Sequence, residues 1–104
     1  MKATVSVTPQ AELQILETSA WWRANRSSAK DLFDDGIARP IALLSEAPDI
    51  GKRYTRTGIP GLRRTLLIGC RYHLYYVHDA AARNVIVLAV WSAVRRRGPS
   101  IQKI

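Results

Sequence analysis

The feature that most limits the possible folds of this 104-residue chain is a change in hydrophobic period near Gly51. Before Gly51, apolar side chains recur every three or four positions, which is typical of helices that bury one face. After it they recur at every second position between closely spaced turn residues, which is typical of β-strands. The sequence therefore predicts an α+β protein with a helical first half and a sheet built mainly by the second half.

The first half is expected to open with a short strand at residues 4–7 and a first helix. Thr8 and Pro9 have the form of a helix N-cap followed by proline at the first helical position, where its missing N–H is not needed. The helix would run from Pro9 to about Asn25. Its buried stripe is predicted from apolar residues at spacings of three and four, with two more beside them: Leu13, Leu16 and Ala20, then Ile15 and Trp22.

A second helix is expected to begin near Ser28, because Ser28 and Asp31 resemble a capping box. Pro40 is expected to kink this helix near Arg39 without ending it, since the apolar period resumes beyond the proline. The two helices would form an α-hairpin. The core face of the second helix is predicted to contain Ala29, Leu32, Phe33, Gly36, Ile37, Ile41 and Leu44.

Four strands are predicted after Gly51, with turns at residues 58–61, 69–70 and 79–83. The strand at 84–91 is the most apolar run of the chain, so we expect it to be buried on both faces at the centre of the sheet. The other three would cover 51–56, which is basic and typical of an edge, 62–68 and 71–78. The order is β-α-α-β-β-β-β, an α-hairpin packed on one face of a small, mostly antiparallel sheet, with a loose tail at 100–104.

Length and composition fit a single domain over residues 1–104. No apolar run approaches the roughly 20 residues of a membrane helix, and the N-terminus lacks the features of a signal peptide, so we expect a cytoplasmic protein without membrane association. Cys70 is the only cysteine and cannot form an internal disulfide. His73 and His78 should lie on opposite faces of one strand, so no metal site and no cofactor are expected.

Charge is divided unevenly between the two halves of the chain. Residues 1–50 carry five basic and seven acidic side chains, a net charge of −2, whereas residues 51–104 carry eleven basic side chains and one acid, a net charge of +10. This division concentrates positive potential on the surface of the second half and predicts an anionic partner. The candidate target contacts are arginines, which bind phosphates and carboxylates bidentately: Arg63, Arg64, Arg71, Arg95, Arg96 and Arg97.

Alternatives remain for these arginines and for the aromatic residues. Residues 95–97 could instead be a solvated basic tail, or could be neutralised by an acidic protein. Trp21 and Trp22 cannot both face inward on one helix, so one of them could anchor a protein partner, or the two could form an edge-buried pair. Three tyrosines beside Arg71 could stack nucleobases or serve as core and cross-strand pairs: Tyr72, Tyr75 and Tyr76.

Three parts of the sequence occur in a familiar order. They are Trp21-Trp22-Arg23, the LRRTLL segment at 62–67 leading into RYHLYY at 71–76, and VWSA at 90–93 followed by RRRGP at 95–99. In this order they resemble the RelE/ParE superfamily of toxins from bacterial toxin–antitoxin modules, over essentially the whole chain. The resemblance implies a small basic toxin held inactive by a cognate antitoxin that wraps the sheet and the α-hairpin. Its candidate antitoxin contacts are Trp21, Trp22 and Trp91.

The resemblance implies one of two activities, because RelE-like members cut mRNA inside the ribosome and ParE-like members poison DNA gyrase without a catalytic site. RNA cleavage by a ribose 2′-hydroxyl needs a base, cations near the phosphate and an acid. By position, Arg64 and Arg96 match two cations of RelE-like members. Leu66 replaces a second lysine, His73 replaces an arginine, and the last 25 residues contain no tyrosine.

Two further positions depart from the pattern of the superfamily. Ser92 stands where many similar members are expected to have a histidine, and Arg96 stands where those members are expected to have a glycine between their final arginines. Because arginine is a poor base, proton transfer would fall to His73 or His78. Because several residues of the RelE-like pattern are missing, gyrase inhibition is the favoured hypothesis, with DNA gyrase as the target. The alternative is an mRNA endonuclease that acts on the ribosome through Arg64, His73 and Arg96, and a non-toxic nucleic-acid-binding module is the second alternative.

Overall fold

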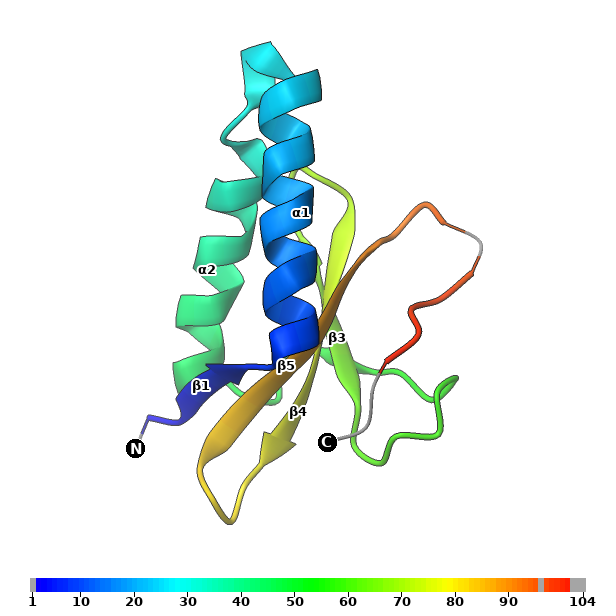
Figure 1. The fold of residues 1–104 in the computed structure, drawn as a ribbon. Helices are drawn as coiled ribbons and strands as arrows, with labels where there is room; N and C mark the ends of the chain where they lie inside the picture. The colour runs from blue at the N-terminus through cyan, green and yellow to red at the C-terminus, as the bar shows by residue number, and fades with distance from the viewer. Residues whose placement is uncertain (1, 96, 102–104) are drawn as a thin grey trace.

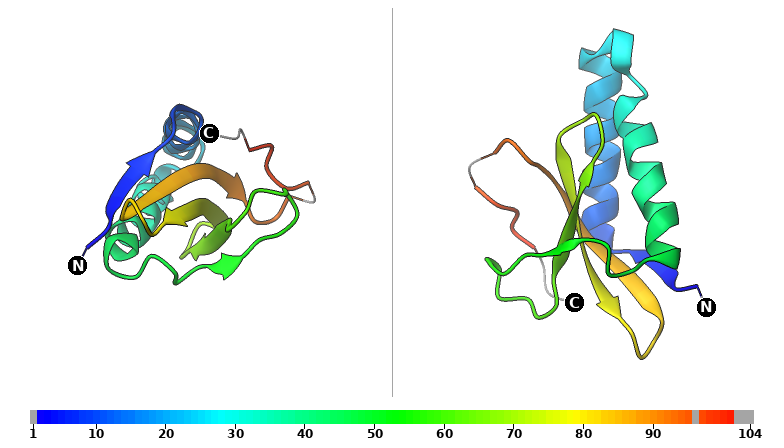
Figure 2. Two further views of the ribbon diagram at one scale, coloured as in Figure 1. Left: turned by 90° about the horizontal axis from the view of Figure 1, so that it is seen from below. Right: turned by 180° about the vertical axis from the view of Figure 1, so that it is seen from behind.

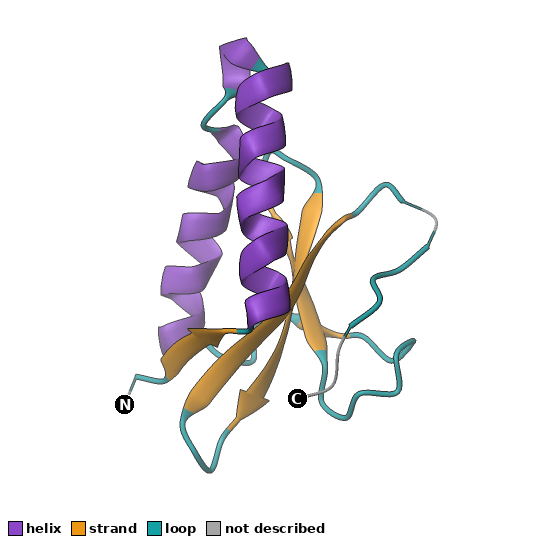
Figure 3. Cartoon of the chain, in the orientation of Figure 1, coloured by secondary structure: helices purple, strands orange, loops and turns teal. Residues whose placement is uncertain are grey.

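In the computed structural model, which describes residues 2–95 and 97–101, two helices lie on one face of a five-stranded sheet (Figure 1). This arrangement confirms the predicted α+β class and element order. Figure 3 separates the helices from the strands by colour. The elements are β1 Thr4–Val7, α1 Pro9–Asn25, a 3₁₀ turn Ser27–Ala29, α2 Leu32–Glu46, β2 Lys52–Arg53, β3 Arg63–Leu67, β4 Tyr72–Asp79 and β5 Asn84–Ser92.

The strands lie in the order β1-β5-β4-β3-β2, with β1 parallel to β5 and the other neighbours antiparallel. The sheet is therefore mostly antiparallel, as predicted. The prediction that residues 84–91 form its centre is wrong, because β1 pairs with the outer side of β5 and leaves β4 in the middle. β5 is nevertheless buried on both faces, since Val87 and Val90 pack under the helices and Leu88 and Ala89 pack on the opposite face.

An irregularity in the β4–β5 pairing explains how adjacent residues of β5 reach the same face. Tyr75 pairs with Ala89, but the next residue, Tyr76, pairs with Val87, so Leu88 is the extra residue of a β-bulge. Leu88 and Ala89 both join the apolar cluster on the face away from the helices. Figure 2 shows that this face is covered by the segments after β2 and after β5 rather than by a helix.

Helix α1 begins as predicted but buries a different stripe. The Thr8 side chain accepts a hydrogen bond from the Ala11 N–H at 3.2 Å, which confirms the N-cap. Leu13, Leu16 and Ala20 are exposed, the two leucines to 57% and 61%, so this part of the predicted stripe is wrong, whereas the inward position of Ile15 and Trp22 is confirmed. The face turned to the sheet has the same spacing but a more polar composition, and contains Ala11, Gln14, Ile15, Thr18 and Trp22.

Gln14 on this face joins α1 to β5 by a hydrogen bond. The Gln14 side-chain oxygen accepts a hydrogen bond from the Val90 N–H at 2.8 Å, which satisfies a donor that β1 is too short to reach. Both faces of α1 carry residues at helical spacing, so the spacing alone does not show which face turns to the sheet.

Helix α2 begins four residues later than predicted, at Leu32. Ser28 lies in the 3₁₀ turn, and the N-cap Asp31 makes no side-chain capping hydrogen bond, so the predicted capping box is wrong. The helix continues through Pro40 to Glu46, as predicted. Phe33, Ile37 and Leu44 are buried, with Ala29 and Ile41 packed against the same cluster, whereas Leu32 is exposed.

The predicted strand at 51–56 is reduced to β2, which pairs only Lys52 and Arg53 with β3. At Tyr54 the chain leaves the sheet, and its N–H donates to the Leu62 carbonyl oxygen at 2.9 Å. Residues 54–62 then fold over the face away from the helices, with positive φ at Gly58 and Gly61 as the predicted turn requires.

The C-terminal segment also returns to the body of the protein. The Gln10 side chain donates to the Ser100 carbonyl oxygen at 3.1 Å, and Ile101 packs against the apolar cluster that contains Leu88. The described part of the predicted loose tail is therefore attached, and residues 102–104 lie outside the described residues.

Candidate functional site: an arginine pocket on the open face of the sheet

A pocket of about 280 Å³ lies on the face of the sheet away from the helices. Its cationic lining residues come from three parts of the chain, and no acidic side chain of the described residues lines it. We call it the arginine pocket and define it by Arg53, Arg56, Arg64, Arg95 and Arg97, together with His73 and the aromatic residues Tyr54, Tyr75 and Trp91. Five cations around one cavity form a site for an anion.

The pairing of the strands brings the central residues of this pocket together. Arg64 on β3 pairs with Tyr75 on β4, and His73 on β4 pairs with Trp91 on β5. These side chains lie on one face because residues of a strand separated by two positions point the same way. The segment after β2 and the segment after β5 then enclose the floor that they form.

The Arg64 guanidinium is held by two tyrosines. Its Cζ lies 4.8 Å from the centroid of the Tyr54 ring, and its Nη1 donates to the Tyr75 hydroxyl oxygen at 3.5 Å. The two tyrosine rings meet edge to face at 5.1 Å. Stacking on an aromatic ring leaves the other guanidinium N–H groups available to an anion.

His73 lies beside Arg64 with its ring centroid 6.0 Å from that of Tyr75. Burial lowers the pKa of His73 below its ordinary value of 6.5, and the positive charge of Arg64 lowers it further. The imidazole is therefore neutral at pH 7, the state in which it can accept a proton.

The segment after β5 is fastened over the pocket by Trp91. The Trp91 indole Nε1–H donates to the Arg97 carbonyl oxygen at 2.8 Å, and the Arg95 guanidinium Cζ lies 4.6 Å from the centroid of the indole ring. A Cβ atom at Gly98 would lie 2.5 Å from the Tyr54 hydroxyl oxygen, so the backbone approaches closely there. Arg96 lies outside the described residues, and its role stays a prediction.

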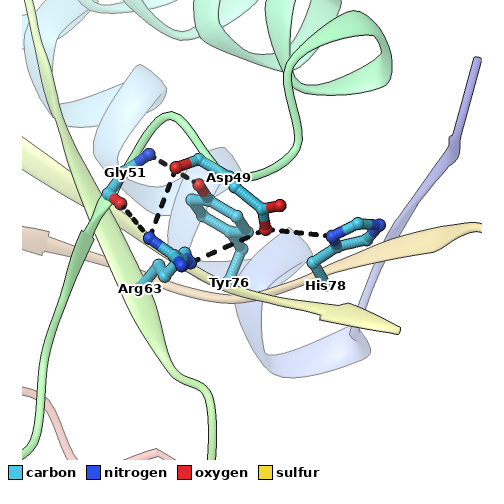
Figure 4. A network of polar contacts seen from close by, with 5 residues as sticks. All are labelled: Asp49, Gly51, Arg63, Tyr76 and His78. Carbon is cyan, nitrogen blue, oxygen red and sulfur yellow. Dashed lines mark hydrogen bonds and ion pairs between the residues drawn. The ribbon is translucent and has the colours of Figure 1, made fainter. Parts of the chain in front are cut away.

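Arg63 and His78 do not line the arginine pocket and instead meet Asp49 in a separate polar network (Figure 4). Arg63 donates to the Gly51 carbonyl oxygen at 2.7 Å and lies 3.8 Å from the Asp49 carboxylate, which in turn lies 3.0 Å from His78 Nδ1. The Tyr76 hydroxyl completes the network by accepting the Gly51 N–H at 2.8 Å. Asp49 therefore binds Arg63, a predicted target contact, and His78, a predicted proton acceptor. The network fixes the chain between α2 and β2.

The remaining candidates, Trp21, Trp22 and Arg71, lie together at the far end of α1. Trp21 is 48% exposed and Trp22 is 8% exposed, so the prediction that the two cannot both face inward is confirmed. Their rings meet edge to face at 6.1 Å. Trp91, the third predicted antitoxin contact, lies in the arginine pocket instead.

The sequence did not point to Arg53, Tyr54 and Arg56 as site residues. They fall in the range predicted as an edge strand, and the pocket needs the early departure of the chain at Tyr54. The available signal was a basic segment without acids directly before a glycine-rich turn. Among the described residues, no cluster of three or more His, Cys, Asp or Glu could hold a metal ion, and no helix is long and apolar enough to cross a membrane.

Comparison with known proteins gives matches to structures only. No protein-family model matches the sequence, and no curated protein matches it significantly. An arginine-to-alanine double mutant of the E. coli toxin RelE in the free state matches with 21% identity and a TM-score of 0.58, covering 90% of this chain and 86% of that chain. The chain has a RelE-like fold.

Two further structures with the RelE-like fold agree with this result. The intact E. coli RelBE toxin–antitoxin complex matches with 20% identity and a TM-score of 0.59, covering 89% of this chain and 99% of the matched chain. The isolated E. coli RelE toxin in its P21 crystal form matches with 20% identity and a TM-score of 0.58, covering 89% and 86%. The resemblance noted in the sequence is thus confirmed at the level of the fold.

On this RelE-like fold, replacing Arg64 with glutamine is expected to raise the pKa of His73, because the variant removes a positive charge beside the imidazole. Burial, the larger cause, should keep the pKa below 6.5. Since the unfolded chain binds this proton more readily, His73 lowers the stability of the folded state as the pH falls below 6.5. An NMR titration of the imidazole C–H resonances measures the pKa of His73 in the wild type and in Arg64→Gln. The His78→Gln variant assigns the resonances. A wild-type midpoint at or above 6.5 would contradict the argument.

Proposed function

We propose that the chain is the toxin of a type II toxin–antitoxin module and that it cleaves mRNA on the ribosome, with the arginine pocket as its active site. The observation that carries this proposal is the imidazole of His73, whose pKa is lowered by burial and by Arg64, in a pocket lined by five arginines and by no acid of the described residues. That combination supplies the base and the anion-stabilising charges that cleavage of a ribose phosphate requires.

The proposed reaction uses the 2′-hydroxyl of the RNA as the nucleophile. His73 accepts the 2′-hydroxyl proton, the 2′-oxygen forms a bond to the adjacent phosphorus, and the bond from phosphorus to the 5′-oxygen breaks. The leaving oxygen takes a proton from water. Arg64 and Arg95, held on the Tyr54 and Trp91 rings, stabilise the negative charge that develops on the phosphate oxygens. The products are a 2′,3′-cyclic phosphate and a 5′-hydroxyl end.

The sequence favoured gyrase inhibition, because the chain lacks the second lysine and the C-terminal tyrosine of RelE-like members. The comparisons do not support that preference and fit the RNA alternative better, since the structures reported above are RelE structures. His73 also supplies a proton acceptor that the arginines cannot provide.

A protein antitoxin is the proposed partner. The RelBE toxin–antitoxin complex among the matched structures supports this proposal. An acidic antitoxin would suit the net charge of +10 on residues 51–104. Trp21, Trp22 and Trp91 stay predicted antitoxin contacts.

Expressing the chain alone from a tightly controlled promoter tests the proposed function. Protein and DNA synthesis are pulse-labelled in parallel, with a His73→Gln variant at equal abundance as the control. Protein synthesis should fall first in cells with the wild-type chain and should continue with the variant. An earlier fall in DNA synthesis would favour gyrase instead. Normal growth with soluble wild-type protein would contradict a toxin and favour a simple nucleic-acid-binding module.

A further inference from the structure

A second pocket, of about 470 Å³, lies between the end of α1 and the start of β4. The residues that give it chemical character are aromatic, cationic or hydroxyl-bearing, and no acid of the described chain lines it. We call it the tryptophan pocket and define it by Trp21, Trp22, Arg26, Arg71, Tyr72 and Ser92. Trp22 and Tyr72 also belong to the core under the helices, but the exposed Trp21, Arg26 and Arg71 do not.

The tryptophan pocket combines an exposed aromatic surface with unpaired cations. The Arg26 guanidinium Cζ lies 6.0 Å from the centroid of the half-exposed Trp21 ring and 5.6 Å from that of Trp22. In the described part of the chain, neither Arg26 nor Arg71 forms an ion pair with an acid. These cations are therefore available to a ligand.

Trp22 forms part of the wall of the tryptophan pocket. Its side chain is more than nine-tenths buried, and its Nε1–H is a buried donor without an acceptor in the described structure. Leaving a buried N–H unpaired destabilises the folded state. This donor is closed to solvent, so the exposed Trp21 ring and the two guanidinium groups carry the case for a ligand.

The tryptophan pocket and the arginine pocket both share lining residues with a third cavity. A groove of about 210 Å³ beside α1 shares Trp91, Ser92 and Arg95 with the arginine pocket, and shares Tyr72 and Ser92 with the tryptophan pocket. The three cavities thus follow one another around the end of β5. Glu17 is the one acid among the residues that line this groove.

We propose that the tryptophan pocket is a second subsite for single-stranded RNA, which binds nucleotides beyond the phosphate that the arginine pocket holds. A base would stack on Trp21, and Arg71 and Arg26 would bind the neighbouring phosphates. The inference rests on the proposed function of the arginine pocket. An acidic protein segment is the competing occupant, but the shared lining residues and the half-exposed indole beside guanidinium groups favour a continuous RNA strand.

Binding of RNA of two lengths tests the second subsite. The full chain is titrated with a labelled trinucleotide and with an RNA of about 12 nucleotides, both 2′-O-methylated so that the nucleophile is blocked. Fluorescence anisotropy is recorded at several salt concentrations. The variants are Trp21→Ala and Arg71→Gln in the tryptophan pocket and Arg64→Gln in the arginine pocket. Arg39→Gln on α2 removes one positive charge outside both pockets.

The longer RNA should bind the wild-type chain more tightly than the trinucleotide. Trp21→Ala should weaken binding of the longer RNA about tenfold and leave trinucleotide binding unchanged. Arg71→Gln should lower the slope of log affinity against log salt by about 0.7, as expected for the loss of one phosphate contact. Arg39→Gln should have neither effect.

The same data separate failure of the subsite from failure of the proposed function. Equal affinity for the two lengths, with trinucleotide binding that depends on Arg64, would overturn the second subsite alone. If the folded wild-type chain binds neither RNA, both the second subsite and the proposed RNA-cleaving function are overturned. Binding of a polyglutamate peptide through Trp21 and Arg71, without any gain for the longer RNA, would make the pocket a protein-docking site and overturn the proposal.

Discussion

Replacing His73 with glutamine is expected to slow mRNA cleavage by a factor of about 10²–10⁴, the usual contribution of a positioned general base. The glutamine side chain keeps a polar group in the pocket but cannot accept the proton of the 2′-hydroxyl at neutral pH. The arginines that bind the phosphate are unchanged in this variant. We therefore expect the loss in the rate of the chemical step rather than in RNA affinity, measured in single-turnover cleavage with translating ribosomes.

His78→Gln is the matched control for this prediction. It removes the only other histidine, which lies beside Asp49 and outside the arginine pocket. Its cleavage rate should equal that of the wild type. Equal rates for His73→Gln and the wild type, with both proteins folded, would remove the general base from the mechanism. A loss of cleavage rate confined to His78→Gln would identify His78, in the Asp49 network, as the general base.

Replacing Gly51 with alanine is expected to lower the free energy of unfolding by about 3 kcal/mol or more, at the upper end of the range for overpacking. An added Cβ would lie 2.8 Å from the Arg64 carbonyl oxygen and from the Tyr76 hydroxyl oxygen, and 2.9 Å from Tyr76 Cε1. One of these atoms is main chain, and Tyr76 is fully buried, so none can move aside cheaply. Urea denaturation measures the change.

Gly58→Ala provides the comparison for this stability prediction. Gly58 has a φ of +73° but no atom within 4 Å of an added Cβ, so alanine there adds only backbone strain, of about 1 kcal/mol. If the two variants lose the same stability, the close contact at Gly51 does not matter. A much larger loss at Gly51 would confirm that the turn between α2 and β2 is fixed by its approach to Tyr76.

Local patterns in the sequence were sufficient to predict most of the elements. The Thr8-Pro9 pair placed the start of α1, and the period of two placed β3, β4 and β5 to within a residue or two. The pattern failed where two stripes of one helix had the same spacing, because Leu13 and Leu16 are more apolar than the Gln14 and Thr18 that face inward. The apolar period alone cannot weigh a hydrogen bond such as that from Val90 to Gln14.

The arginine pocket was only partly predictable, because its geometry depends on contacts between distant residues. Alternation along β3 places Arg63 and Arg64 on opposite faces, but only the position of Asp49 shows which of them is engaged elsewhere. The approach of His73 to Arg64 depends on the register between β3 and β4. The central position of β4 likewise follows from the pairing of β1 with β5, which is a long-range contact.

The end groups of mRNA incubated with the purified chain and translating ribosomes test the central claim most directly. Attack by the 2′-hydroxyl, with His73 as the base, predicts fragments that carry a 5′-hydroxyl and a 2′,3′-cyclic phosphate. Cleavage should disappear when the attacking nucleotide is replaced by its 2′-deoxy form, and should be strongly slowed in His73→Gln. Intact mRNA on ribosomes, together with inhibition of DNA supercoiling by gyrase, would contradict the account.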